Sequence, residues 1–344
     1  MNKFQKISKF KLLLFMIVTS LFYIIGLSFD LIISTSCGAS YLIGIFSILF
    51  LLIITIFLPK HLKLPFKTIS NNIVRIIYKI SIIVQSICII VFSSSFIQTY
   101  FNIKSSLLIF IIIFLISTFF VSRSSLKNIV NTSFLFCLVS VISYIIPLTN
   151  NCERSFVYLE LFQNNFHYII IFSLLITSYI TDYIIISFYQ NQVSSPLSKS
   201  DFLLYGLITI SIVSFIIFDS TTIISYKYYE GINNASFFHW MLYKGNKYIN
   251  NFDILVFIIM ITSVFFKITF NFNFLNVLSK KSFISSNYFN IIIIFIFSGF
   301  IYYNRSYYYL SNIILNIINV IFSITIVTLT IILFKTNKEI GGNT

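Results

Sequence analysis

The chain of 344 residues is far more apolar than a water-soluble protein. Hydrophobic residues make up 58% of it, charged residues only 9%, and the mean hydropathy is +0.96. A soluble domain devotes about a quarter of its residues to charge, so this composition excludes a water-soluble globule. The formal net charge of +14 would suggest nucleic acid as a partner, but the positions of the basic residues decide its meaning.

Ten mostly apolar stretches predict membrane-spanning helices, because a bilayer core needs about 20 consecutive apolar residues in a helix. All four prolines fall in or beside the polar loops between them, where proline interrupts no helix. The first stretch follows a basic leader, and we interpret it as a membrane helix rather than a signal peptide. The predicted spans are residues 12–35, 40–58, 76–100, 105–121, 127–147, 167–189, 202–224, 253–278, 288–304 and 309–334.

Basic residues are distributed unevenly between the predicted loops. With a cytoplasmic N-terminus, sixteen of the 23 lysines and arginines lie on the cytoplasmic side and six on the outer side. This bias is typical of membrane proteins, and an even number of spans then places both termini in the cytoplasm. We therefore expect anionic lipid headgroups, and not nucleic acid, as the partner of these residues. The one basic residue left, Lys267, lies inside a predicted helix.

Lys267 is the strongest indication of function in the sequence. It lies near mid-membrane, where an ionised side chain costs about 2.5 to 3.5 kcal/mol on insertion scales. Ser263 and Asn271 lie four residues before and after it, so this helix face should turn toward the protein interior. The candidate counter-charges are Asp30 and Asp182. The lysine is either a structural residue that bridges helices or a fixed cation at a ligand or ion site.

Short polar patches precede both aspartates, at residues 26–28 in the first predicted helix and 178–181 in the sixth. Transporters built from inverted repeats use helices that are broken at corresponding positions of their two halves. The patches therefore favour a single integral membrane domain over residues 1–344, with inverted repeats at about 12–147 and 167–334.

The sequence contains no catalytic or metal-binding motif. The four cysteines have no CxxC spacing and the three histidines are far apart, so we expect neither a metal nor another cofactor. Glycine-rich phosphate loops, GxSxG and HExxH are also absent, which argues against an enzyme. Cys37 and Cys152 both lie on the predicted outer side, where a disulfide between them is one option. The outer segment 225–252 predicts a short interfacial helix.

The segment YINNFDILVFIIMITSVFFKITFNFNFL, residues 248–275, resembles the signature of the B subunits of spore germinant receptors, the endospore germination permeases. Four residues match that signature in register: Asp253, Phe265, Lys267 and Ile268. Asparagine and methionine stand where the signature has arginine and tryptophan. The short N-terminal segment and the ten predicted spans agree with the layout of that family.

The resemblance implies a fold like that of amino acid/polyamine/organocation transporters, with the first and sixth helices broken around a central site and the eighth beside it. It also implies a germinant-sensing role in the inner spore membrane, with germinant receptor A and C subunits as partners. Lys267 would then project toward the first helix and replace the sodium ion of cation-coupled relatives. A small polar ligand, such as an amino acid, would bind at Gly26, Ser28, Ser178, Tyr179, Thr181 and Asp182.

Two other functions stay open from the sequence. The first is a secondary transporter of amino acids or related solutes in the cell membrane, on the same fold. The second is a polytopic enzyme of envelope glycans, which would need a basic or histidine-bearing outer loop. The predicted outer loops are poorly supplied with such residues, so the sequence favours the sensor and then the transporter.

Overall fold

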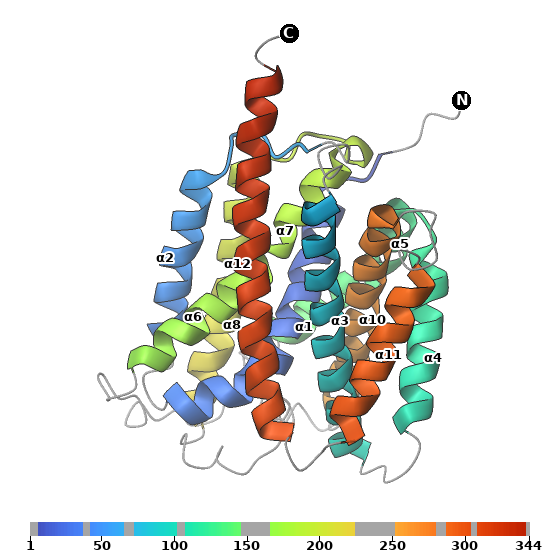
Figure 1. The fold of residues 1–344 in the computed structure, drawn as a ribbon. Helices are drawn as coiled ribbons and strands as arrows, with labels where there is room; N and C mark the ends of the chain where they lie inside the picture. The colour runs from blue at the N-terminus through green and yellow to red at the C-terminus, as the bar shows by residue number, and fades with distance from the viewer. Residues whose placement is uncertain are drawn as a thin grey trace.

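The computed structural model describes residues 6–36, 42–64, 72–101, 107–145, 166–223, 252–279, 287–303 and 308–341. Within these ranges the chain is almost entirely helical (Figure 1), and each of the ten predicted stretches contains helix. The helices are α1 (Lys9–Ser36), α2 (Leu42–Phe57), α3 (Asn72–Phe101), α4 (Leu107–Ser122), α5 (Leu126–Ile145), α6 (Phe166–Ile180), α7 (Asp182–Ile185), the 3₁₀ helix η5 (Ile186–Gln192), α8 (Lys199–Ile223), α10 (Phe252–Leu278), α11 (Asn287–Tyr303) and α12 (Tyr308–Gly341).

Six helices in the described ranges are long and apolar enough to cross a membrane. Side chains in such helices face lipid or other helices, so hydrophobic residues are needed on all sides. The six apolar segments are Asn72–Val91, Leu126–Ser143, Ile169–Gln192, Lys199–Asp219, Phe257–Leu278 and Ile317–Thr336, and shorter apolar helices cover Leu42–Phe57, Ile111–Ser122 and Phe289–Phe300. This is the helix content that a multi-pass membrane protein requires.

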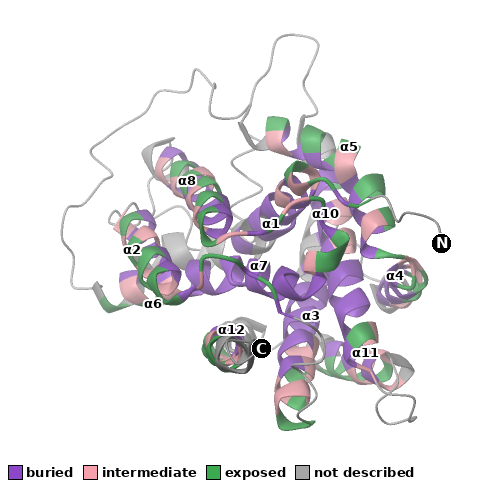
Figure 2. Ribbon diagram, turned by 90° about the horizontal axis from the view of Figure 1, so that it is seen from above, coloured by how far each residue is buried: buried purple, intermediate pink, exposed green. Residues whose placement is uncertain are grey.

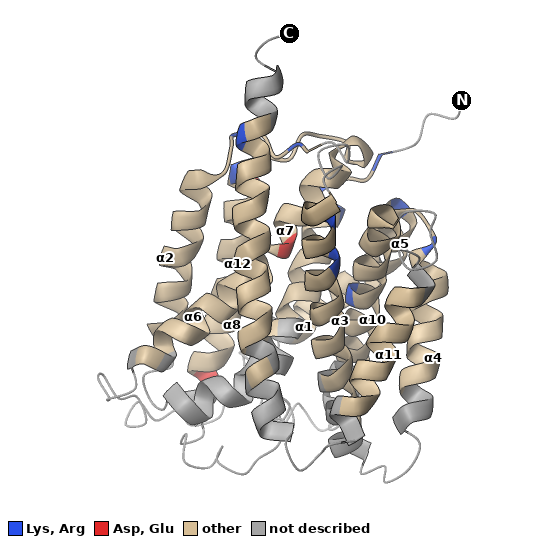
Figure 3. Cartoon of the chain, in the orientation of Figure 1, with Lys and Arg blue, Asp and Glu red and all other residues tan. Residues whose placement is uncertain are grey.

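The start of α1 and the end of α12 lie at the same end of the helix bundle, which we call the termini-bearing end (Figure 1). Figure 3 shows that most described lysines and arginines also gather at this end. Among the described residues, this gathering of lysines and arginines at one end agrees with the uneven distribution of basic residues predicted from the sequence.

The described helices form two groups. The first group consists of α2, α6 and α8, with α7 as the continuation of α6. The second group consists of α3, α4, α5, α10 and α11, among which α10 contacts all the others. The helix α1 packs on both groups, against α6 and α8 of the first and against α5 and α10 of the second. The most deeply buried residues lie along the boundary between the groups, on α1, α3, α7 and α10 (Figure 2). The helix α12 packs against α3 and α6.

Small residues allow α2 to approach its neighbours closely. A Cβ atom on Gly44 would lie 2.1 Å from the Oγ and 2.7 Å from the Cβ of Ser214 in α8. On the side facing α6, Ser173 donates a hydrogen bond of 3.0 Å to the carbonyl of Ile43. Lipid supplies no hydrophobic force between helices, so close packing of this kind is a main source of helix association in a membrane.

The sixth predicted helix tightens at Thr181, between α6, which ends at Ile180, and α7, which begins at Asp182. The backbone of Thr181 keeps helical dihedral angles (φ −63°, ψ −15°), so the chain continues as one helical segment from Ile169 to Gln192. The first helix, α1, runs without interruption from Lys9 to Ser36, so the predicted break near Gly26 and Ser28 is wrong. A lone glycine inside a helix costs only about 1 kcal/mol relative to alanine, and the helix tolerates it.

Replacing Gly44 with alanine should weaken the packing of α2 on α8. The new Cβ would overlap the Ser214 side chain, and overpacking of this kind costs about 1–3 kcal/mol. We expect Gly44→Ala to lower the unfolding temperature of the detergent-solubilised protein, measured by thermal denaturation.

Gly299→Ala is the matched control, because a Cβ on Gly299 would meet no atom within 4 Å. Adding Ser214→Gly to Gly44→Ala removes the overlapping atoms and should recover part of the lost stability. An unfolding temperature that falls equally for Gly44→Ala and Gly299→Ala would contradict the close approach of α2 and α8.

Candidate functional site

Hydroxyl side chains surround the tightened helical turn between α6 and α7. Ser178 donates to the carbonyl of Leu175 at 2.6 Å, and Thr181 donates to the carbonyl of Ser178 at 2.5 Å. The backbone N–H groups of Thr181 and Ile184 each bond to the carbonyl three residues earlier, at 3.2 and 2.8 Å. Three-residue spacing tightens the helix, and side chains that bond to backbone carbonyls compete with the regular ladder. The turn at Thr181 therefore follows from the polar patch in the sequence.

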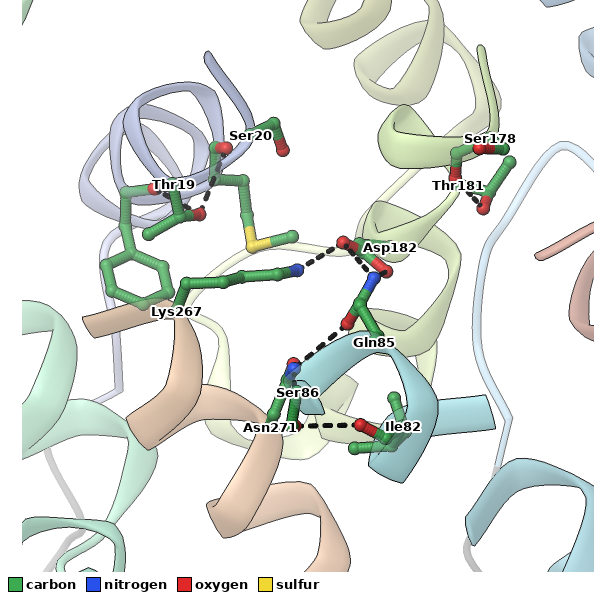
Figure 4. Close-up of polar contacts among 12 residues, drawn as sticks. Thr19, Ser20, Ile82, Gln85, Ser86, Ser178, Thr181, Asp182, Lys267 and Asn271 are labelled. Atoms are coloured by element: carbon green, nitrogen blue, oxygen red, sulfur yellow. Dashed lines mark hydrogen bonds and ion pairs between the residues drawn. The ribbon is translucent and has the colours of Figure 1, made fainter. Parts of the chain in front are cut away.

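Asp182, the first residue after this turn, forms an ion pair with Lys267 of α10 (Figure 4). Both side chains are buried, with 4% and 2% of their surface exposed. Ser263 and Asn271 on the same face of α10 are buried as well, which confirms that this face turns to the interior. Of the two candidate counter-charges, Asp182 is the one that the structure brings to Lys267.

Two amides complete a polar network around the carboxylate. Gln85 of α3 donates to both oxygens of Asp182, at 2.9 and 3.1 Å. Asn271 donates to the side-chain oxygen of Gln85 at 3.0 Å and to the hydroxyl of Ser86 at 3.2 Å. Hydrogen bonds of this kind are needed to keep a charge buried, because the desolvation cost of each ion amounts to several kcal/mol.

The network crosses the boundary between the two helix groups. Asp182 belongs to the first group, whereas Lys267, Asn271 and Gln85 belong to the second. Its bonds therefore connect the groups at a depth where the side chains are shielded from water and lipid. Any change in the ion pair changes how the two groups are held together.

Gln85 and Ser86 were not among the predicted site residues. The signal was present in the sequence, because Gln85 is an amide within a predicted span and such side chains commonly bond between membrane helices. The partner of Gln85 could not be identified from the sequence. About 80 to 100 residues separate Gln85 from Asp182, and Asp182 from Lys267, so only the fold brings the three together.

The other predicted ligand residues of the sixth span do not join the network. The hydroxyls of Ser178 and Thr181 bond to carbonyls of α6 and lie away from Lys267 in Figure 4. Tyr179 is fully buried. Ser178 and Thr181 shape the turn, Tyr179 bonds to Asn319 of α12, and Asp182 places its charge beside Lys267.

Lys267 extends toward Asp182, and its predicted projection toward Gly26 and Ser28 stays a prediction, because the side chains at these positions lie outside the described residues. Thr19 and Ser20 are among the α1 residues that lie near Lys267 in Figure 4. Phe15 of α1 also packs against two aromatic residues of α10 that flank Lys267. Its ring centroid lies 6.5 Å from that of Phe266 and 6.1 Å from that of Phe270. The helices α1 and α10 thus meet more than one turn before Gly26.

Several predictions from the sequence lie outside the described residues. They concern the disulfide between Cys37 and Cys152, the interfacial helix in residues 225–252, and the side chains of Gly26, Ser28 and Asp30.

The segment that follows Asp182 is fixed at the termini-bearing end. Tyr189 of η5 donates to Asn273 of α10 at 2.9 Å. Asn273 in turn donates to the carbonyls of Ser122 and Ser124, both at 2.9 Å, at the turn between α4 and α5. These bonds anchor η5 to the second helix group, so α7 is held at both of its ends.

Two loop segments pair with the chain between η5 and α8. Ile7 exchanges backbone hydrogen bonds with Gln192 and Ser194, at 2.7 and 2.9 Å. Leu62 bonds to Leu197 at 2.9 Å through its N–H. We call this arrangement of residues 6–8, 58–64 and 187–199 the clasp. An ion pair of 2.6 Å between Lys9 and Asp201 lies beside the clasp.

Lys267→Met and Asp182→Asn should each destabilise the protein strongly, because each leaves the opposite charge buried without its partner. Removing one member of a buried ion pair costs about 3–5 kcal/mol. The double variant removes both charges and should lose less than the sum of the single losses. The measurement is the free energy of unfolding in mixed detergent micelles.

Lys335→Met is the matched control, because Lys335 is an exposed lysine of α12. Additive losses in the double variant, or a loss from Lys267→Met no greater than that from Lys335→Met, would show that the pair carries no coupling energy.

A scan against protein-family models and a search of curated proteins found no match to this chain. The inference of function therefore rests on the buried network around Lys267 and on the resemblance of residues 248–275.

Proposed function

We propose that the chain is a membrane protein of ten spans with a fold like that of amino acid/polyamine/organocation transporters, and that it senses a small polar solute as the B subunit of a spore germinant receptor. The observation that carries the proposal is the buried Lys267–Asp182 ion pair beside the tightened turn of the sixth helix. In this proposal the protein lies in the inner spore membrane, both termini are cytoplasmic, and A and C subunits are its partners.

The residues that carry the resemblance include those at the site. Lys267 holds Asp182, and Ile268 beside it is fully buried. Phe265 packs edge-on against Phe114 of α4, with ring centroids 5.8 Å apart. The matched positions thus include residues that seat α10 in the second helix group and place the ammonium at the group boundary.

The helix arrangement supports the proposed fold. The first and sixth spans, α1 and α6, contact one another, and α10, the eighth, contacts α1 and α3. Transporters of this kind work by movement of one helix bundle against another around a central site. A solute that alters the ion pair would shift the two groups and so pass a signal to neighbouring subunits, provided that it binds one arrangement better than the other.

A lysine in place of an ion favours sensing over sodium-coupled transport. A sodium ion dissociates after it crosses the membrane and can drive a solute with it, whereas an ammonium on α10 stays with the protein. Lys267 pairs with Asp182 and is itself part of α10. The position of the ion pair at the boundary between the helix groups also suits a secondary transporter, which remains the second candidate. A measurement of solute flux distinguishes the transporter from the sensor.

Germination tests the sensor directly. Spores that carry Lys267→Met in the chromosomal copy should lose their response to the germinant that triggers the parent strain, because the variant cannot hold Asp182. The readout is the fall in optical density on germination, and Lys335→Met serves as the control. A full response from Lys267→Met spores with normal protein levels, or a source organism that forms no endospores, would contradict the sensor.

Uptake tests the transporter. Proteoliposomes that contain the purified chain should accumulate no labelled amino acid above empty liposomes, with or without an imposed sodium or proton gradient. Gradient-driven uptake by the wild type that is lost in Lys267→Met would contradict the sensor. It would instead support the second candidate, a secondary transporter.

Orientation has its own test. Green fluorescent protein fused after Thr344 should fluoresce, because it folds on the cytoplasmic side, and alkaline phosphatase fused there should be inactive. The reverse result would place the termini-bearing end outside the cell and contradict the proposed topology.

A further inference from the structure

Three polar side chains meet where α1 and α5 begin, at the termini-bearing end. The two helices pack on one another, and both start at this end (Figure 1). The ammonium of Lys11 in α1 donates to the side-chain oxygen of Asn131 in α5 at 3.3 Å. Lys127 lies four residues before Asn131, so both project from the same face of α5. We call Lys11, Lys127 and Asn131 the basic corner.

The basic corner carries positive charge at a place that favours an anion. Among the described residues Lys11 contacts no carboxylate, and its partners are the oxygen of Asn131 and the ring of Phe134, 4.9 Å from the ammonium to the ring centroid. Lys9 differs from it, because Lys9 pairs with Asp201. The first turn of α5 contains a lysine and no acidic residue, although the N–H groups at a helix start favour negative charge.

Exposed apolar side chains border the basic corner. Phe10, the neighbour of Lys11, is 61% exposed and packs edge-on against Phe134, with ring centroids 6.5 Å apart. Leu135, which follows in α5, is 68% exposed. The apolar segment Leu126–Ser143 is long enough to cross a membrane, so its first turns lie near the depth of the lipid headgroups. An anion at the basic corner therefore lies beside a surface suited to acyl chains.

We infer that the basic corner binds the headgroup of an anionic phospholipid, which bridges α1 and α5 in the leaflet at the termini-bearing end. The lipid phosphate accepts hydrogen bonds from the ammonium groups of Lys11 and Lys127. It also accepts from the NH₂ group of Asn131, which donates to no described residue. The acyl chains pack along Phe10 and Leu135, which a free phosphate ion would leave without an apolar partner.

This site differs from the general attraction of basic residues to an anionic membrane, because one lipid is held by defined contacts from two helices. The helix α1 packs on both helix groups, and the lipid would fix its start to α5 of the second group. The site is separate from the buried ion pair. It therefore concerns a sensor and a transporter alike.

The test is native mass spectrometry of the purified full chain in detergent, titrated with phosphatidylglycerol or phosphatidylcholine of identical acyl chains. We expect the wild type to bind its first phosphatidylglycerol at least about tenfold more tightly than its first phosphatidylcholine. Lys11→Gln and Lys127→Gln should each lower the affinity for phosphatidylglycerol about fivefold, the effect of one lysine at an anionic membrane surface. Lys335→Gln, at an exposed lysine of α12, is the matched control and should keep the wild-type affinity.

Asn131→Leu distinguishes a defined site from diffuse attraction, because the substitution changes no charge. Loss of the amide removes one donor to the phosphate and the acceptor that orients Lys11. The affinity for phosphatidylglycerol should therefore fall about threefold, the effect of one hydrogen bond. Diffuse attraction predicts an unchanged affinity. Excess inorganic phosphate should not displace the bound lipid, because it lacks the acyl chains.

Equal affinity of the wild type for the two lipids would overturn the inference, and this comparison needs no variant. An equal loss from Lys335→Gln and Lys11→Gln, or an unchanged affinity in Asn131→Leu, would overturn it as well. Displacement of the lipid by inorganic phosphate would show a site for the free ion and overturn the lipid as its occupant. Each of these results would leave the proposed function in place.

Discussion

One ammonium and one carboxylate hold the centre of this protein together. Lys267 and Asp182 are each too costly to bury alone, and their mutual attraction, with the amides of Gln85 and Asn271, is what permits both in the interior. Because the charges come from different helix groups, the cost of separating them resists separation of the groups. The turn at Thr181 and the hydrogen bonds that anchor η5 position the carboxylate of Asp182 for this pairing.

The helices and the site were predictable to different degrees. Each predicted apolar stretch contains helix, and the interior face of α10 followed from Ser263, Lys267 and Asn271 lying four residues apart. Hydropathy and helical spacing are local properties, so sequence alone reveals them. The break predicted in α1 was wrong because a glycine makes a helix break possible without requiring one, whereas the hydroxyls around Thr181 bond to the carbonyls and stabilise the turn in the sixth span.

The partners in the network depended on the fold. Asp182 was one of two candidate counter-charges, and no local pattern distinguished it from Asp30. Gln85 lies on a helix whose facing direction is set by packing against α10, α11 and α12. Contacts between residues far apart in the chain follow from the way helices are arranged, and a single sequence carries little direct information on that arrangement.

The clasp has a consequence for the order in which the chain is made. Ile7 pairs with residues near 193, so it stays without its backbone partners until the chain has been synthesised beyond that position. Gln85 and Asp182 are likewise translated before Lys267. Partners that are already in the membrane when the lysine arrives would lower the barrier to inserting a charged helix. A circular permutation that placed α10 first would remove this advantage while leaving every contact of the final structure unchanged.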